Sequence, residues 1–306
     1  ALWMLRLLTS AQGLSKFVRK DEFASDELAH ALGLGHWVCP DDRAFSPQAV
    51  RAELHALRDQ AEQQADAAAS LPEVLQANVQ RLSALVELEA VDAQILAFSV
   101  CLHADPLLYE AADLLGPLSS GQVAQSLARV LNLPEPQVRL ALGGQGLLAH
   151  TGMVTLDQQG SNLLRGKLDL LSPSFADAMV SWECQPAELL HGKLNTAAPA
   201  RLALADYRHV QPMLDIMRSW LQQALSTRRR GVNLLLYGPP GTGKTELTST
   251  LAQDLDCNLF EVAIEDEDRD PISGGGRLRA LRAAQCLLAQ SKALLVFDEV
   301  EDVFSD

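Results

Sequence analysis

The chain has 306 residues, of which 48% are hydrophobic and 21% are charged, and its formal net charge at pH 7 is −14. This length predicts two or three domains, each long enough to bury a core. The acidic balance argues against a general affinity for polyanions such as nucleic acids.

Five cysteines are scattered along the chain, and no two of them have C-x-x-C spacing. We therefore expect reduced thiols in a cytoplasmic protein and no structural zinc. His36 and Cys39 are three residues apart, but a metal would need two more ligands, so a local turn is the better interpretation. No run is long enough to span a membrane, the apolar residues 1–8 are too short for a signal peptide, and we expect no membrane contact.

The first domain predicted from the sequence covers residues 1–70 and is helical. Its helix patterns are broken at Gly13, around Gly33 and Gly35, and at Pro40. Ser46 and Pro47 open a long helix over 47–69, rich in Ala, Gln and Glu, with one thin packing face. Nothing in this region indicates a chemical function.

The second predicted domain covers residues 71–170. Apolar periodicity predicts helices over 88–102, 106–115, 122–131 and 135–142, with a break at 132–134. Leu147-Leu148 and residues 153–156 are expected to pair as a hairpin across Thr151 and Gly152. This order of helix, turn, helix and hairpin resembles a winged helix-turn-helix domain, which implies either DNA binding or protein binding.

Protein binding is the better interpretation of this domain. Its candidate recognition helix offers only Gln137 and Arg139 beside Glu135, and Arg165 and Lys167 are balanced by nearby acids. A DNA interface needs more positive charge. DNA therefore remains the weaker alternative. The basic run 228–230 follows a predicted helix over 211–227, where it complements the helix dipole without any ligand.

Residues 171–205, with Pro173, Pro186 and Pro199, are expected to be a connector, and 206–306 the third domain. In that domain the apolar run 233–237 predicts a strand and 246–255 a helix. The segment between them is a glycine-rich loop with the sequence Gly238-Pro239-Pro240-Gly241-Thr242-Gly243-Lys244-Thr245, and we group Glu246 with it as nucleotide-binding.

The backbone N–H groups of such a loop, with the positive end of the helix after it, suit a triphosphate. Lys244 would contact the β- and γ-phosphates, and the hydroxyl of Thr245 would bind the Mg²⁺ that bridges them. The expected cofactors are thus ATP and Mg²⁺. A glycine-rich turn that merely caps a helix is the alternative.

A second motif supports this prediction. Residues 293–297 form an apolar run typical of a buried parallel strand, and Asp298 and Glu299 follow it. Asp298 would hold Mg²⁺, mostly through water, and Glu299 would orient and deprotonate the attacking water. With a strand over 259–263 and a helix over 277–290, the order β-α-β-α-β predicts an incomplete parallel sheet flanked by helices, the core of an α/β P-loop NTPase.

Residues 238–245 and 294–304 resemble the Walker A and Walker B segments of the AAA (AAA+) family of ATPases. The resemblance covers about residues 203–306. It implies ATP and ADP binding, a homo-oligomeric ring, and an ATP-driven machine that remodels a protein or protein–nucleic acid target. It also makes Asp206, Tyr207 and His209 candidates to line the adenine pocket. The acidic stretch 265–276 lacks the aromatic pore loop of protein-threading members, so threading is not expected.

The family also has a sensor strand, an arginine finger and a helical lid after Walker B. The chain ends at Asp306 and begins at Ala1 without an initiator Met, so we expect a fragment of a longer protein that alone hydrolyses ATP slowly. Two hypotheses follow: an Mg²⁺-dependent ATPase with Lys244 and Glu299 as catalytic residues, or a nucleotide-gated adaptor or DNA-binding regulator acting through the winged region.

Overall fold

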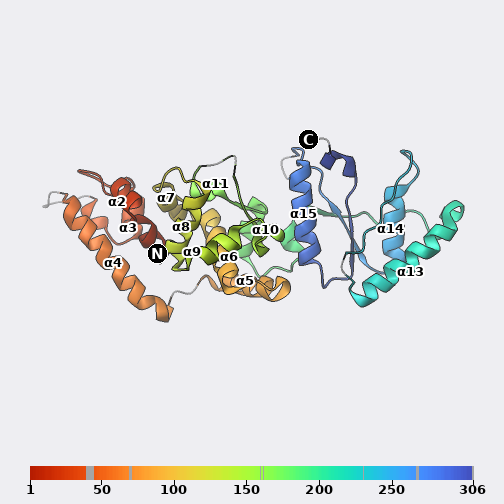
Figure 1. The fold of residues 1–306 in the computed structure, drawn as a ribbon, viewed down its shortest axis with the longest axis horizontal. Coiled ribbons are helices and arrows are strands. Elements are labelled where there is room, and N and C mark those ends of the chain that lie inside the picture. The colour runs from red at the N-terminus through yellow and green to blue at the C-terminus, as the bar shows by residue number, and fades with distance from the viewer. Residues whose placement is uncertain are drawn as a thin grey trace. The chain divides into compact units, whose positions relative to one another are not determined.

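The computed structural model describes residues 1–38, 45–68, 71–158, 160, 162–229, 231–266 and 269–304. The chain forms two compact units, Ala1–Glu183 and Cys184–Asp306. In Figure 1 the first unit runs from red to green and the second from green to blue. Cys39 lies outside the described residues, as does Arg230. The four cysteines that are described form no disulfide with one another.

The first unit is mainly helical. Its described elements are α1 (Leu2–Leu8), α2 (Ala11–Phe17), α3 (Asp26–Ala31), η1 (Gly35–Trp37), α4 (Pro47–Ala68), α5 (Glu73–Val86), α6 (Ala90–Ala104), α7 (Pro106–Asp113), α8 (Ser120–Leu131), α9 (Glu135–Leu142), α10 (Leu147–His150), β1 (Val154–Leu156), α11 (Leu164–Lys167), β2 (Leu168–Leu170) and α12 (Pro173–Ser181).

Helix α6 forms the centre of this unit. Its side chains are buried on all sides, including Ile95, Leu96, Phe98 and Val100, and a helix that is apolar all round belongs in a core. Helices α5, α7, α9 and α12 pack against it. No single helix in the described ranges is long and apolar enough to cross a membrane; α6 and α7 pass that test only as a pair, and they are bent by 99°.

Helix ends in this unit follow local signals. The Asp105 carboxylate caps α7 by accepting a 2.9 Å hydrogen bond from Leu107 N, and Pro106 occupies the first helical position. Gly13 is not a helix break, contrary to expectation: it lies inside α2, where a Cβ would clash with the Leu7 carbonyl oxygen. The break falls at Ser10, whose hydroxyl caps α2 by accepting from Gly13 N.

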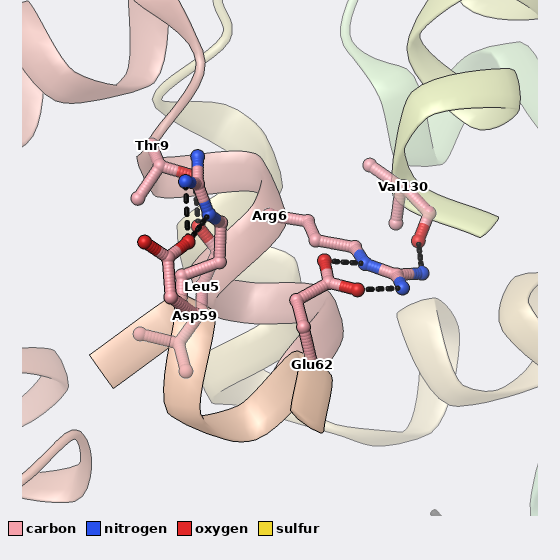
Figure 2. Close-up of polar contacts among 7 residues, drawn as sticks. Leu5, Arg6, Thr9, Asp59, Glu62 and Val130 are labelled. Carbon is pink, nitrogen blue, oxygen red and sulfur yellow. Dashed lines mark hydrogen bonds and ion pairs between the residues drawn. The ribbon is translucent and has the colours of Figure 1, made fainter. Parts of the chain in front are cut away.

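A charged pair joins the first and fourth helices of this unit. Figure 2 shows the guanidinium of Arg6 on α1 donating through Nε and Nη2 to both carboxylate oxygens of Glu62 on α4, each at 2.8 Å. Its Nη1 donates to Val130 O on α8 at 2.7 Å. The hydrogen bond from Arg6 lowers the pKa of Glu62. One side chain therefore fastens three helices together.

The hairpin predicted across Thr151 and Gly152 is wrong. Residues 147–150 form α10, in which Leu148 is buried, and β1 pairs antiparallel with β2, so that Thr155 lies opposite Asp169. This pairing buries the apolar Leu168 and Leu170 of β2, which a local turn could not reach. Two helices and a short two-stranded sheet thus follow one another in the expected order, and the winged helix stays a prediction.

The proline-containing stretch 171–205 is more structured than the connector we expected. Pro173 begins α12, whose Phe175 and Met179 are buried. Asn78 Nδ2 on α5 donates to Met179 O at 3.1 Å and to Trp182 O at 2.8 Å, which ties down the end of α12. The division between the units, after Glu183, falls within this stretch.

The second unit has helices on a small sheet. Its described elements are η2 (Glu188–Leu190), β3 (Leu194–Thr196), η3 (Leu204–Val210), α13 (Gln211–Thr227), α14 (Lys244–Asp254), β4 (Asn258–Val262), α15 (Gly274–Leu287), β5 (Ala293–Val296) and η4 (Val300–Phe304). The strand order is β3-β4-β5, with β3 antiparallel to β4 and β4 parallel to β5. In Figure 1, α15 covers one side of the strands and α14 the other.

The parallel β4-α15-β5 unit agrees with the predicted α/β core, but the predicted strand over 233–237 is wrong. This stretch belongs to no helix or strand in the described part of the chain. Leu236 packs against the core formed by α13, α14 and η3, whereas Leu235 and Tyr237 are 74% and 89% exposed. A strand needs a hydrogen-bonded neighbour. The edge of β4 that faces away from β5 is occupied by β3, a strand that we did not predict from the sequence.

Candidate nucleotide-binding site

The loop 238–243 leads directly into α14, as the sequence predicts. Gly241 and Gly243 have φ values of +76° and +80°, in the left-handed region that glycine adopts at low cost. Gly243 is the N-cap of α14 and, having no side chain, makes no cap hydrogen bond. The first-turn N–H groups of α14 therefore remain available to an anion at the loop, whose residues 238–242 are exposed.

Lys244 folds back over this loop. Its Nζ donates to Gly238 O at 3.0 Å and to Pro239 O at 3.1 Å. The hydroxyl of Thr242 also donates to Pro239 O, at 2.9 Å, while Pro240 stands exposed beside it. The ammonium group is thus held at the loop by carbonyl oxygens that a phosphate group could replace as acceptors.

Thr245 and Asp298 meet although they come from different elements. Thr245 Oγ1 donates to Asp298 Oδ2 at 3.1 Å, joining the first turn of α14 to the segment after β5. A hydroxyl and a carboxylate are hard oxygen ligands of the kind Mg²⁺ prefers, with phosphates and water completing its shell. The described residues contain no group of three or more His, Cys, Asp or Glu that could hold a metal. The pair fits a magnesium ion held jointly with a nucleotide.

Glu299 lies beside this pair and is exposed. Its φ is +50°, which costs a residue with a Cβ about 1–2 kcal/mol. Its backbone N–H donates to Asp298 Oδ1 at 3.0 Å, so one oxygen of Asp298 is engaged by the backbone and the other by Thr245. Strained backbone of this kind is common at functional sites.

Glu246 has a role that its place in the motif did not reveal. Its Oε1 accepts hydrogen bonds from the backbone N–H groups of Arg201 and Leu202, the latter at 3.1 Å. Thr250, one turn further along α14, donates to Leu202 O at 3.3 Å. The segment between β3 and η3 is therefore bound to the helix that follows the loop.

Of the three adenine-pocket candidates, only Tyr207 reaches the loop. Its ring lies 3.9 Å from the place where a Cβ of Gly243 would be, and its buried hydroxyl has no hydrogen-bond partner. Asp206 instead caps η3 by accepting from Ala203 N at 2.9 Å. The exposed His209 has its ring centroid 6.4 Å from that of Tyr207. Tyr207 therefore packs beneath the loop at Gly243, and its buried hydroxyl is left without a hydrogen-bond partner, which is costly.

A glycine-rich loop at the start of a helix, together with carboxylates that follow a parallel strand, is typical of P-loop α/β proteins. Residues 234–306 match the family model described as ATPase family associated with various cellular activities (AAA). This part of the second unit is accordingly similar to the AAA family.

Similar proteins point the same way. The RuvB subunit of the Holliday junction branch migration complex of Synechocystis sp. is 31% identical over 121 residues, which cover 38% of this chain and 32% of that protein. The replication factor C large subunit of Sulfolobus acidocaldarius is 25% identical over 113 residues, 34% of this chain and 23% of that protein. The replication factor C large subunit of Methanococcoides burtonii is 29% identical over 87 residues, which cover 28% of this chain and 18% of that protein. The chain spans a third or less of each relative, and no solved structure matches it.

Proposed function

We propose that this chain carries the nucleotide site of an AAA-type, Mg²⁺-dependent ATPase. The observation that supports this most directly is the 3.1 Å hydrogen bond between Thr245 and Asp298. It joins the glycine-rich motif to the acidic motif that follows β5. Loop N–H groups and Lys244 bind the phosphates of ATP. Thr245 and Asp298 hold Mg²⁺, which neutralises phosphate charge when bound, and Glu299 orients and deprotonates the attacking water.

We further propose that the protein assembles into a homo-oligomeric ring and remodels a protein or protein–nucleic acid target in the cytoplasm, as its similarity to the AAA family suggests. We assign target recruitment to the first unit. Its candidate DNA-reading helix is poorly suited to DNA, since Arg139 Nη2 is paired with Glu135 Oε1 at 2.6 Å. Lys167 is buried and donates to Asp157 O at 2.8 Å, and the Arg165 guanidinium stacks on the Tyr109 ring. These contacts favour a protein target over DNA.

The proposal is tested by binding and turnover measured separately. A fluorescent ATP analogue should bind the chain in the presence of Mg²⁺, and Lys244→Ala should weaken binding strongly because the phosphate contact is lost. Lys292→Ala is the control. That side chain is 54% exposed, and its Nζ makes a long ion pair with Asp256 Oδ2, at 3.8 Å. Equal binding by Lys244→Ala and the wild type would remove the nucleotide site from the loop.

Turnover is measured as phosphate release. Glu299→Gln should abolish release while analogue binding survives, because the amide cannot accept the proton of water. Glu301→Gln on η4 is the matched control and should leave release unchanged. If target remodelling persisted without ATP turnover, the nucleotide-gated adaptor would replace the motor.

A further inference from the structure

The most deeply buried cation among the described residues is Arg277, which is 1% exposed. It lies in the first turn of α15, where Ser273 caps the helix by accepting from Gly276 N at 3.2 Å. Burying a guanidinium removes it from water at a cost of several kcal/mol unless its donors find good partners. A buried arginine on a helix that otherwise packs through Ala and Leu therefore calls for a specific role.

Several of its contacts lie on the segment after β5. Nη1 donates to Glu299 O at 3.2 Å, and Nη2 donates to Asp298 O. The guanidinium also stacks on the ring of Phe297, with Cζ 4.5 Å from the ring centroid. Three consecutive residues at the carboxyl end of the strand are thus held by one side chain from the neighbouring helix.

The fork of the guanidinium suits this task. Two N–H groups in a rigid plane fix two successive carbonyl groups, and with them the backbone between Asp298 and Glu299. That backbone includes the unfavourable φ of +50° at Glu299. Fixing the carbonyls orients the backbone from which both carboxylates leave the chain; that of Asp298 accepts from Thr245, and Glu299 is exposed.

We propose that Arg277 is a positioning residue for the carboxylate pair: by holding the carbonyls of Asp298 and Glu299 it presents the first to Mg²⁺ and the second to water. This inference rests on the proposed ATPase function. We assign Arg277 to the backbone that carries the two carboxylates, with no direct role at the nucleotide or the metal. Its loss should therefore spare Mg²⁺-independent phosphate contacts, which belong to the loop, and impair the part of binding that depends on Mg²⁺.

The test compares Arg277→Met and Arg277→Lys with Arg282→Met, which alters an exposed arginine of the same helix. A fluorescent ATP analogue is titrated in EDTA and at increasing Mg²⁺ concentration, and thermal unfolding is followed in parallel. In Arg277→Met we expect the affinity for the ATP analogue in EDTA to stay within about twofold of wild type. The Mg²⁺ concentration that gives half of the maximal increase in analogue binding should rise about tenfold, the size of effect expected when a residue that supports a metal ligand is lost.

Arg277→Lys keeps the charge but cannot hold two carbonyls at once, so we expect an intermediate shift; it also carries the test if Arg277→Met does not fold. Arg282→Met should behave as wild type. An unchanged Mg²⁺ titration in folded Arg277 variants would overturn the positioning role alone. Affinity lost equally in EDTA and in Mg²⁺ would also overturn it, since the role would then be general stability. Wild-type protein that binds no nucleotide would overturn the proposed function, and this inference with it.

Discussion

Thr245 donates a hydrogen bond to Asp298 from a position 53 residues earlier in the chain. The contact spans the whole β4-α15-β5 crossover, because α14 precedes it and the carboxylate follows it. A nucleotide site at the loop is consequently assembled from two segments that only the folded sheet brings together.

Removing the Thr245 hydroxyl tests this contact. We expect Thr245→Val to lower the affinity for the Mg²⁺ complex of ATP by at least about tenfold, because a metal ligand and its bond to Asp298 are lost together. Affinity for ATP in EDTA should hardly change. Calorimetric titration with and without EDTA measures both. Thr248→Val, whose hydroxyl donates only to Thr245 O, is the control; equal losses in the two buffers would exclude a magnesium role.

The hydrogen bonds that Glu246 accepts from the backbone of 201–202 stabilise that segment locally. In Glu246→Ala the N–H groups of Arg201 and Leu202 lose their acceptor, so their segment should open more often. Hydrogen–deuterium exchange should become faster by about tenfold in peptides covering 197–204, equivalent to about 1.4 kcal/mol. The exposed Gln253→Ala on α14 should leave exchange there unchanged. Unaltered exchange in Glu246→Ala would show that Thr250 suffices.

His103 predicts that the first unit loses stability in mild acid. Burial lowers the pKa of His103 from its ordinary value of 6.5, and Nε2 donates to Leu168 O at 2.9 Å. The unfolded chain then binds the proton more tightly, so this contribution to stability is complete above pH 6.5 and is lost as the pH falls below it.

Urea unfolding followed at pH 7.5 and pH 5.5 measures this effect. The stability difference between the two pH values should shrink in His103→Gln, which keeps a donor without titrating. The exposed His150→Gln should retain the wild-type difference. A full wild-type difference in His103→Gln would assign the pH dependence to other groups.

Glu62→Gln tests the pair that joins α1 to α4. The neutral amide keeps one hydrogen bond to Arg6 but leaves its charge uncompensated, and we expect a loss of about 1 kcal/mol, modest because Glu62 is 39% exposed. Since the pKa of Glu62 is lowered from 4.5, its contribution is present above pH 4.5 and is lost in stronger acid. Denaturant curves at pH 7 and pH 3.5 should therefore converge for variant and wild type at the lower pH. If the stability difference between variant and wild type persisted at pH 3.5, it would have to come from side-chain packing and not from the charge of Glu62.

The loop and the acidic pair of the candidate site could be located in the sequence because each is a short, local motif. The glycines of 238–243 need their backbone freedom in place, and Asp298 and Glu299 directly follow an apolar run. Arg277 escaped prediction for a physical reason: amphipathic periodicity treats every arginine as exposed, and only the folded structure shows that this one meets backbone carbonyls.

The fold was predicted less evenly. Helices with strong caps, such as α7 and α8, lie where apolar periodicity placed them. Pairing across long loops was missed, as in β1 with β2 and β3 with β4, because the partner of a three-residue strand is chosen by burial and not by local sequence. For the same reason an apolar run such as 233–237 does not reveal whether a neighbouring strand pairs with it.

The hydrogen bond from Leu202 to Glu246 gives the first turn of α14 two contacts within the second unit. Lys244 in this turn bonds to the loop, and Glu246, two residues later, accepts from the backbone of 201–202, a segment that lies between β3 and η3. One helical turn therefore supports both the glycine-rich loop and the segment that follows the edge strand of the sheet.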